Sequence, residues 1–160
     1  MSGPLMIILM GSKADEGHCH EIAEAARVFG LEVVLHVGSA HKTPHHVLSI
    51  LEHHEREGRP RVYVTVAGRS NALSGFTDSC VTAPVIACPP CSEAFGGADI
   101  YSSLRTPSGI APAVVLEPAN AALLAAKILG LANTELRDKV AAYQKAQAEK
   151  VLADDQALNG

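Results

Sequence analysis

Apolar residues along this chain form two kinds of run, and the two kinds alternate. The first, Leu5 to Met10, is continuous, as expected for a strand covered on both faces. Apolar residues then recur at helical spacing from Ile22 to Phe29, which predicts a helix packed on the sheet. Gly30 is predicted to end that helix. The first thirty residues therefore predict a strand followed by a helix.

The same alternation continues through the chain. The second helix is predicted to have Thr43 as its N-cap and Pro44 as its first residue, and to close at Gly58. Strands separated by single helices pair in parallel through right-handed crossovers. Five strands predict one α/β domain over 1–160, a three-layer α/β/α sandwich with a central parallel sheet of flavodoxin-like type. The remaining elements are predicted as strands over 31–37, 61–66, 84–87 and 113–116 and a helix over 120–131.

Two segments depart from this alternation. Residues 88–112 are long for a loop, but their Gly-Gly, Thr-Pro and Ser-Gly pairs indicate ordered irregular structure, which often carries function. The segment 133–160 has an apolar stripe with Leu136, Val140 and Tyr143 among charged residues. A solitary helix of this kind is poorly stable in water. It can pack on its own domain, but we favour a C-terminal helical arm that reaches across a neighbouring subunit.

Composition narrows the class of protein. A chain of 160 residues with 48% hydrophobic residues and a net charge of -4 fits one soluble globular domain and gives no reason to expect nucleic-acid binding. No apolar run approaches the roughly 18 residues of a membrane span. The apolar N-terminal stretch has no basic residues before it, so it is interpreted as a strand rather than a signal peptide. We therefore expect a cytoplasmic protein with no membrane partner.

All four cysteines are predicted to be free thiols, because nothing indicates secretion. Cys88 and Cys91 have redox spacing, but the two prolines between them favour a loop over the helix start that a redox motif requires. His18 and His20 flank Cys19, and these are zinc-ligand residue types. In a helix, however, positions 18 and 20 point to different faces. A solvated helix face is favoured, and no metal site is predicted.

Residues suited to binding a phosphate are predicted to gather where the strands end. Ligands of open parallel sheets bind beyond the carboxyl ends of the strands. Glycine and serine follow each of the first three strands, as Gly11-Ser12, Gly38-Ser39 and Gly68-Arg69-Ser70. Free N–H groups at helix starts attract phosphate, and glycine lets the backbone approach it. One such serine alone is better explained as a helix cap, but three junctions at one edge predict a phosphorylated sugar ligand.

Charged and titratable side chains adjoin these junctions. Lys42 and Arg69 can add positive charge, and Asp15 can accept hydrogen bonds from sugar hydroxyls. His41 stands at the mouth of the second strand, and a histidine titrates near neutrality, with a reference pKa of about 6.5. Together, His41 and Lys42 indicate acid/base chemistry on a bound anion.

Five motifs occur in an order and at spacings that match a known family. MGSKAD, SAHKTP, VAGRSNALSG, CPP and SSLRTPSG lie between Met6 and Leu131, and the set closely resembles the phosphoribosylaminoimidazole (AIR) carboxylases of de novo purine synthesis. The resemblance implies a carboxy-lyase that combines 5-aminoimidazole ribotide (AIR) with CO2 to give 4-carboxy-5-aminoimidazole ribotide (CAIR). It implies no cofactor: neither ATP, biotin nor metal. It also implies a homo-oligomer, commonly an octamer, whose C-terminal helices reach onto neighbours.

Two branches of this family differ in the quoted motifs. One branch rearranges an N5-carboxylated ribotide and tends to read SAHRTP and AGGAAHLPG. This chain has Lys42 in the first motif and Asn71-Ala72 where the second has its histidine. It therefore resembles the branch that uses CO2 directly. The mutase is the alternative, followed by a nucleotide- or flavin-binding module, which the absence of Trp and the three Tyr and three Phe disfavour.

The resemblance also implies a role for individual residues. His41 would move the proton at C4 of the imidazole ring. Ala40, Ala67, Pro89 and Pro90 would wall a small dry pocket for CO2. Substrate binding would fall to Gly11, Ser12, Asp15, Ser39, Lys42, Gly68, Arg69 and Ser70.

Overall fold

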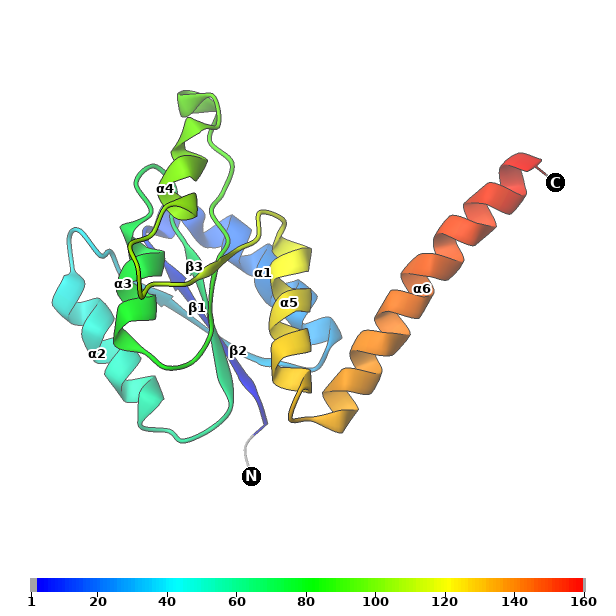
Figure 1. Ribbon diagram of the computed structural model, residues 1–160, viewed down its shortest axis with the longest axis horizontal. Coiled ribbons are helices and arrows are strands. Elements are labelled where there is room, and N and C mark those ends of the chain that lie inside the picture. Colours follow the sequence, from blue (N-terminus) through cyan, green and yellow to red (C-terminus); the bar gives the residue numbers. More distant parts are fainter. Residues whose placement is uncertain (1–2, 160) are drawn as a thin grey trace.

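A parallel sheet of five strands lies at the centre of the computed structural model, which describes residues 3–159 (Figure 1). The strands are β1 (Leu5–Met10), β2 (Glu32–Val37), β3 (Arg61–Val66), β4 (Val85–Ala87) and β5 (Ala113–Val114). Their order is β2-β1-β3-β4-β5, and each neighbouring pair is parallel. β1 and β3 are buried along their whole length. The predicted flavodoxin-like α/β/α fold is confirmed; residues 1, 2 and 160 of the expected domain and arm lie outside the described part.

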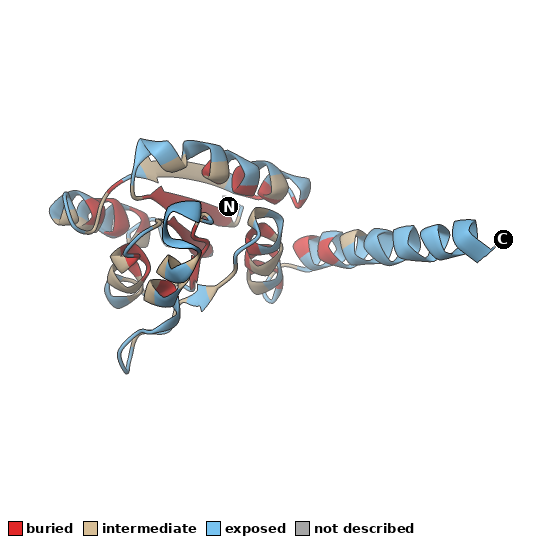
Figure 2. Cartoon of the chain, turned by 90° about the horizontal axis from the view of Figure 1, so that it is seen from above, coloured by how far each residue is buried: buried red, intermediate tan, exposed pale blue. Residues whose placement is uncertain are grey.

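Helices cover both faces of this sheet. The helices on the sheet are α1 (Glu16–Val28), α2 (Pro44–Glu55), α3 (Ala72–Cys80) and α5 (Pro118–Gly130), whereas α4 (Tyr101–Leu104) lies in the segment after β4 and α6 (Thr134–Asn159) packs on α5. Successive residues of β1 point to opposite faces. Ile8 belongs to the buried cluster with α1 and α5, whereas Ile7 belongs to the cluster with α2 and α3. Figure 2 shows the buried sides of these helices turned toward the sheet.

The last two strands are shorter than predicted. β4 begins at Val85 because Pro84 has no N–H to donate, although its carbonyl accepts a hydrogen bond from Tyr63 N at 3.0 Å. β5 ends at Val114, and one further bond, from Val115 N to Ala87 O at 2.9 Å, holds the chain before it leaves the sheet. The edge strand opposite β2 is therefore only two residues long, and the segment that precedes it is irregular.

Helix α3 was not predicted from the apolar pattern. It has only nine residues, and Ser74, Gly75 and Thr77 have low helix propensity. The available signal was Asn71, whose side-chain Oδ1 accepts from Ser74 N at 3.3 Å and caps the helix.

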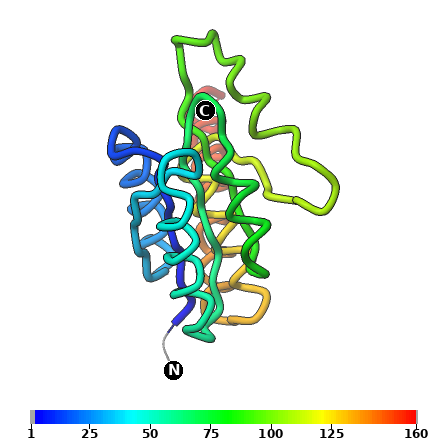
Figure 3. The backbone as a smooth tube through the Cα atoms, turned by 90° about the vertical axis from the view of Figure 1, so that its left-hand side faces the viewer, coloured from blue at the N-terminus to red at the C-terminus, as the bar shows by residue number. Residues whose placement is uncertain are grey.

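The segment 88–112 is ordered and irregular, as predicted. It contains two short 3-10 helices, η2 (Glu93–Phe95) and η3 (Ala98–Ile100), and the single turn of α4. Gly96 and Gly97, between the 3-10 helices, adopt φ angles of 56° and 79°, which glycine reaches without steric cost. Figure 3 shows this segment projecting beyond the layers at one end of the molecule.

Helix α6 packs on its own domain only through its first turns. Leu136 and Val140 are buried, and Tyr143 meets Phe29 edge-on with ring centroids 5.2 Å apart. Residues 144–159 are all exposed and extend away from the sandwich (Figures 1 and 2). Contact with a neighbouring subunit stays a prediction for that part. Across the described chain, no helix combines the length and the apolar character that crossing a bilayer requires.

Candidate active site

A cavity of about 460 Å³ opens at the carboxyl ends of β1, β2 and β3. The sheet order places the loops after these three adjacent strands side by side. The cavity is lined by every residue predicted to bind substrate, by His41, and by two of the residues predicted for the CO2 pocket. Those lining residues are Gly11, Ser12, Asp15, Ser39, Ala40, His41, Lys42, Ala67, Gly68, Arg69 and Ser70; Ala14 and Leu73 complete the lining and were not predicted.

The first junction is a short 3-10 helix, η1 (Lys13–Asp15), capped by Ser12. Ser12 Oγ accepts from Ala14 N at 3.2 Å, so this serine serves as a cap as well as lining the cavity. Partial burial raises the pKa of Asp15, while a hydrogen bond with the Ser12 backbone and the nearby His18 oppose that rise. Asp15 is thus a partly desolvated carboxylate facing the cavity, where an incoming hydroxyl can replace lost water.

The second junction holds His41 in a turn closed by Ser39 and Thr43. Thr43 N donates to Ser39 O at 2.8 Å, and Ser39 N donates to Thr43 Oγ1 at 2.9 Å. Thr43 is the N-cap of α2 and Pro44 its first residue, as predicted, but the Thr43 hydroxyl bonds back to Ser39 and not to the first turn of the helix. Ser39 Oγ accepts from Lys42 N at 3.2 Å, which leaves the hydroxyl proton of Ser39 available to a ligand.

Two glycines allow these turns to start close to their neighbours. A Cβ on Gly38 would lie 2.7 Å from Val47 Cγ2, and a Cβ on Gly11 would lie 3.3 Å from Ala67 Cβ. The first distance is shorter than real Cβ contacts allow, so a side chain at position 38 would push the His41 turn away from α2.

The third junction is braced by residues that the sequence did not indicate. Arg69 has a φ of 60°, in the left-handed region that non-glycine residues rarely adopt. Asp99 Oδ2 accepts from Arg69 N at 3.1 Å, and Ser102 Oγ accepts from Asn71 N at 2.9 Å. Asn71 Nδ2 donates to Ser103 Oγ at 2.9 Å in a buried contact. The segment around α4 therefore holds the Gly68–Asn71 loop in shape; the only signal for it was the motif SSLRTPSG.

The four residues predicted for one CO2 pocket fall in two cavities. Ala40 and Ala67 line the cavity with His41. Pro89 and Pro90 line a second cavity of about 420 Å³, which Ala67 and Gly68 border from the other side. Ala67 and Gly68 line both cavities, so the two cavities adjoin at the loop after β3, and a CO2 pocket walled by all four residues stays a prediction.

The cysteine and histidine motifs do not form a site. The described structure contains four free thiols, as predicted. Burial raises the pKa of Cys88 to about 12 and that of Cys19 to about 12, so both stay protonated at neutral pH. Of the three residues expected on a solvated helix face, His20 is exposed and His18 is half-buried, but the expectation is wrong for Cys19, which is fully buried. His18 Nε2 lies 3.1 Å from Cys88 O, which ties α1 to the end of β4.

Comparison with known proteins shows which protein family has this fold and this cavity. Residues 5–150 match the family model described as AIR carboxylase. The chain belongs to this family. A phosphoribosylaminoimidazole carboxylase of Treponema denticola is 56% identical over 155 residues, which cover 97% of this chain and 98% of that protein. One of Archaeoglobus fulgidus is 49% identical over 156 residues, covering 98% of this chain and 86% of that protein. The crystal structure of Treponema denticola PurE superposes with a TM-score of 0.96 at 55% identity, covering 98% of this chain and 99% of that one.

Proposed function

We propose that this AIR carboxylase family member joins CO2 to C4 of AIR to give CAIR, reversibly and without ATP, in de novo purine synthesis. The observation that carries the proposal is the one cavity that brings His41, Lys42 and Arg69 together with three glycine-serine junctions. A phosphorylated sugar needs donors and positive charge for its anion, and the reacting ring needs one proton-transfer group beside it.

The phosphate of the ribotide is assigned to the loop after β3. Gly68, Arg69 and Ser70 precede the N-terminus of α3, where backbone N–H groups and the helix dipole favour an anion. Arg69 adds a permanent charge. At the adjacent junction, after β1, Asp15 accepts hydrogen bonds from the ribose hydroxyls, beside Ser12.

His41 is assigned the proton at C4. The exocyclic amine of AIR pushes electron density to C4, which attacks CO2 and then carries both the new carboxylate and its original proton. Neutral His41 removes that proton, and the ring regains its aromaticity. In reverse, protonated His41 returns the proton to C4 and CO2 leaves. Catalysis comes from the orientation of AIR and CO2 and from one positioned base. Neither step transfers a phosphoryl group, so the reaction needs no ATP.

CO2 is assigned to the His41 cavity. Ala40 and Ala67 present small apolar surfaces there, and CO2 has no net charge to be solvated. Pro90 supports this wall from behind, since a Cβ on Gly68 would lie 3.7 Å from Pro90 Cγ.

The residues at positions 71 and 72 favour direct use of CO2 over the mutase reaction. Ala72 stands where the motif AGGAAHLPG has its histidine, and the buried side chain of Asn71 beside it caps α3 and donates to Ser103, so neither residue can shuttle a proton as a histidine would. The test supplies the purified protein with AIR and bicarbonate in the absence of ATP. We expect CAIR to form; rapid conversion of the N5-carboxylated ribotide with no product from AIR would instead establish the mutase.

We also propose a cytoplasmic homo-oligomer, an octamer as the resemblance implies, with residues 144–159 as its intersubunit arm. Val151, Leu152 and Leu158 are exposed on that part of α6, and a helix without tertiary contacts has little stability of its own. A neighbouring subunit would cover these side chains. Free thiols fit a reducing compartment.

Replacing Asp15 with Asn is expected to weaken ribotide binding about tenfold or more, because the ribose loses a charged acceptor. The same change is expected to raise the melting temperature slightly at pH 7. Burial raises the pKa of Asp15, so the folded state bears a cost for keeping it ionised above its unfolded pKa, and Asn removes that cost. Calorimetric titration and thermal melting measure the two effects, and the stability difference should shrink as the pH falls through the raised pKa. Asp138→Asn, an exposed carboxylate outside the cavity and outside residues 144–159, is the control. Unchanged ribotide affinity in Asp15→Asn would contradict the assignment.

Replacing Asp99 with Ala is expected to raise KM for AIR about tenfold with a smaller change in kcat. The substitution removes the acceptor for Arg69 N, and the left-handed conformation of Arg69 then loses its support. Steady-state kinetics measures the split between KM and kcat. Glu93→Ala, an exposed carboxylate in the same segment, should behave as wild type. A tenfold loss in kcat with KM unchanged would instead indicate that Asp99 acts in the chemical step.

A further inference from the structure

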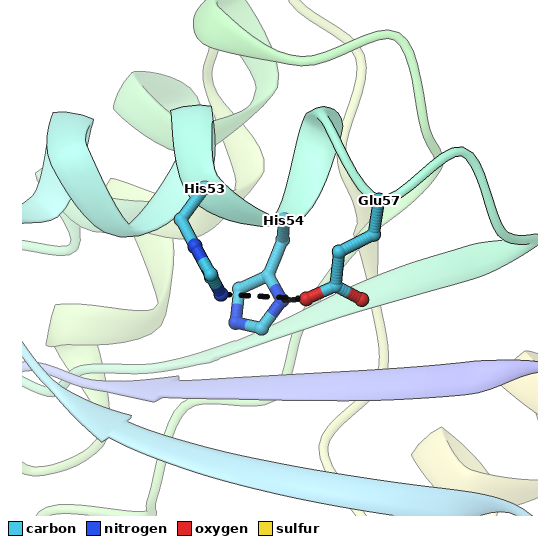
Figure 4. A group of neighbouring side chains, drawn as sticks. All are labelled: His53, His54 and Glu57. Carbon is cyan, nitrogen blue, oxygen red and sulfur yellow. Dashed lines mark hydrogen bonds and ion pairs between the residues drawn. The ribbon is translucent and has the colours of Figure 1, made fainter.

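A second group of chemically active side chains lies at the opposite end of α2 from His41. His53, His54 and Glu57 each offer one nitrogen or oxygen atom, and these atoms lie within 4.8 Å of one another (Figure 4). Glu57 Oε1 is 3.0 Å from His54 Nδ1 and 3.5 Å from His53 Nε2. Among residues 3–159, no second group of three such residues is this close.

His54 is held by more than its neighbours in sequence. Its residue is 4% exposed, and its Nε2 lies 2.9 Å from Nε2 of His36 on β2. Glu57 Oε1 accepts from the Nδ1–H of His54, because a carboxylate has no proton to donate, and His54 Nε2 accepts from the Nε2–H of His36. An ion bound at Nδ1 would take the place of that proton, and His54 Nε2–H would then donate to Nε2 of His36.

This is the arrangement that a metal-bound histidine requires. A ligating imidazole almost always donates its other N–H to a fixed acceptor, which sets its tautomer and its orientation. In a tetrahedral Zn²⁺ site with bonds of about 2.0–2.1 Å, ligand atoms lie about 3.3 Å apart. The distances of 3.0 Å and 3.5 Å from Glu57 Oε1 are close to that separation. The side chain of His53 is 68% exposed, so it can rotate toward the shared point at little cost.

We propose that His53 Nε2, His54 Nδ1 and Glu57 Oε1 form a binding site for a divalent transition-metal ion of the zinc class, with His36 orienting His54. Two imidazoles and one carboxylate are a donor set that Zn²⁺ accepts, with water completing the coordination on the solvent side. The ion would join the end of α2 to the connection that leads into β3. The helix separates Pro44 from His54 by about 15 Å, so the ion is structural and takes no part in the reaction at His41.

The test titrates metal-free protein with Zn²⁺ in competition with a chromophoric chelator. We expect one site per chain that the substitutions His53→Ala, His54→Gln and Glu57→Gln each weaken at least tenfold. His36→Leu is expected to weaken it about tenfold through lost orientation alone. Because His53 is exposed, its substitution leaves the fold intact, and circular dichroism checks this for the buried positions.

The matched control is His20→Ala. His20 Nε2 and Glu16 Oε1 lie 3.9 Å apart at the same i,i+4 spacing on α1, but that pair has no buried second histidine. The substitution His20→Ala should therefore leave Zn²⁺ affinity unchanged. Equal affinity in wild type and His53→Ala, or a loss as large in His20→Ala, would show that surface histidines bind the ion without a built site and would overturn the proposal.

Discussion

His41→Asn is expected to lower kcat for AIR carboxylation by roughly 10²- to 10⁴-fold, the usual worth of a positioned general acid or base. Asparagine is of similar polarity and can form hydrogen bonds, but it cannot exchange a proton near neutral pH. The turn should survive, because Ser39 and Thr43 close it through their own bonds. Ribotide affinity should therefore stay close to wild type, and a kcat loss without a loss of binding separates proton transfer from positioning.

Single-turnover kinetics and calorimetric titration with AIR measure the two quantities on the same protein. The control is His45→Asn, an exposed histidine in the first turn of α2 that does not line the cavity. It should turn over at the wild-type rate. Activity near wild type in His41→Asn would remove this imidazole from the proton transfer, and the mechanism would need another group in the same cavity.

Ending the chain after Lys145 is expected to reduce the assembly state while leaving each subunit folded. The truncation removes most of the exposed part of α6, with Val151, Leu152 and Leu158, but keeps Leu136 and Val140 in the core. Apolar side chains that only a neighbour can cover contribute to association and nothing to the isolated subunit. Light scattering measures the mass, and thermal melting at low protein concentration reports on the subunit itself.

The comparison truncation ends the chain after Asn133. It removes the buried Leu136 and Val140 as well, and each fully buried aliphatic side chain contributes about 1.5–3 kcal/mol. This shorter chain should be destabilised, whereas the chain ending at Lys145 should not. A wild-type mass for the latter would refute the intersubunit arm.

Most of the fold could be predicted from local patterns. The bounds of β1 and β3 match the apolar runs because strands buried on both faces carry a continuous hydrophobic signal. Helix α3 escaped because a short segment rich in Ser, Thr and Gly has weak propensity, and its stability comes from Asn71 and from packing against the sheet. β4 was predicted one residue too long because Pro84 has no N–H to donate, and β5 was predicted too long because only Ala113 and Val114 pair with β4.

The sequence by itself determined which residues end the first three strands, and parallel pairing then requires those ends to meet at one edge. His41, Asp15 and Arg69 could therefore be assigned to one cavity without coordinates. Only the tertiary structure decided which residues support that cavity and what lies next to it: Asp99 lies thirty residues after Arg69, and Pro90 lines a second cavity that adjoins the first at Ala67 and Gly68. The tertiary structure also placed His36 Nε2 within hydrogen-bonding distance of His54 Nε2. Such contacts join residues far apart in the chain, and no local spacing encodes which of them will touch.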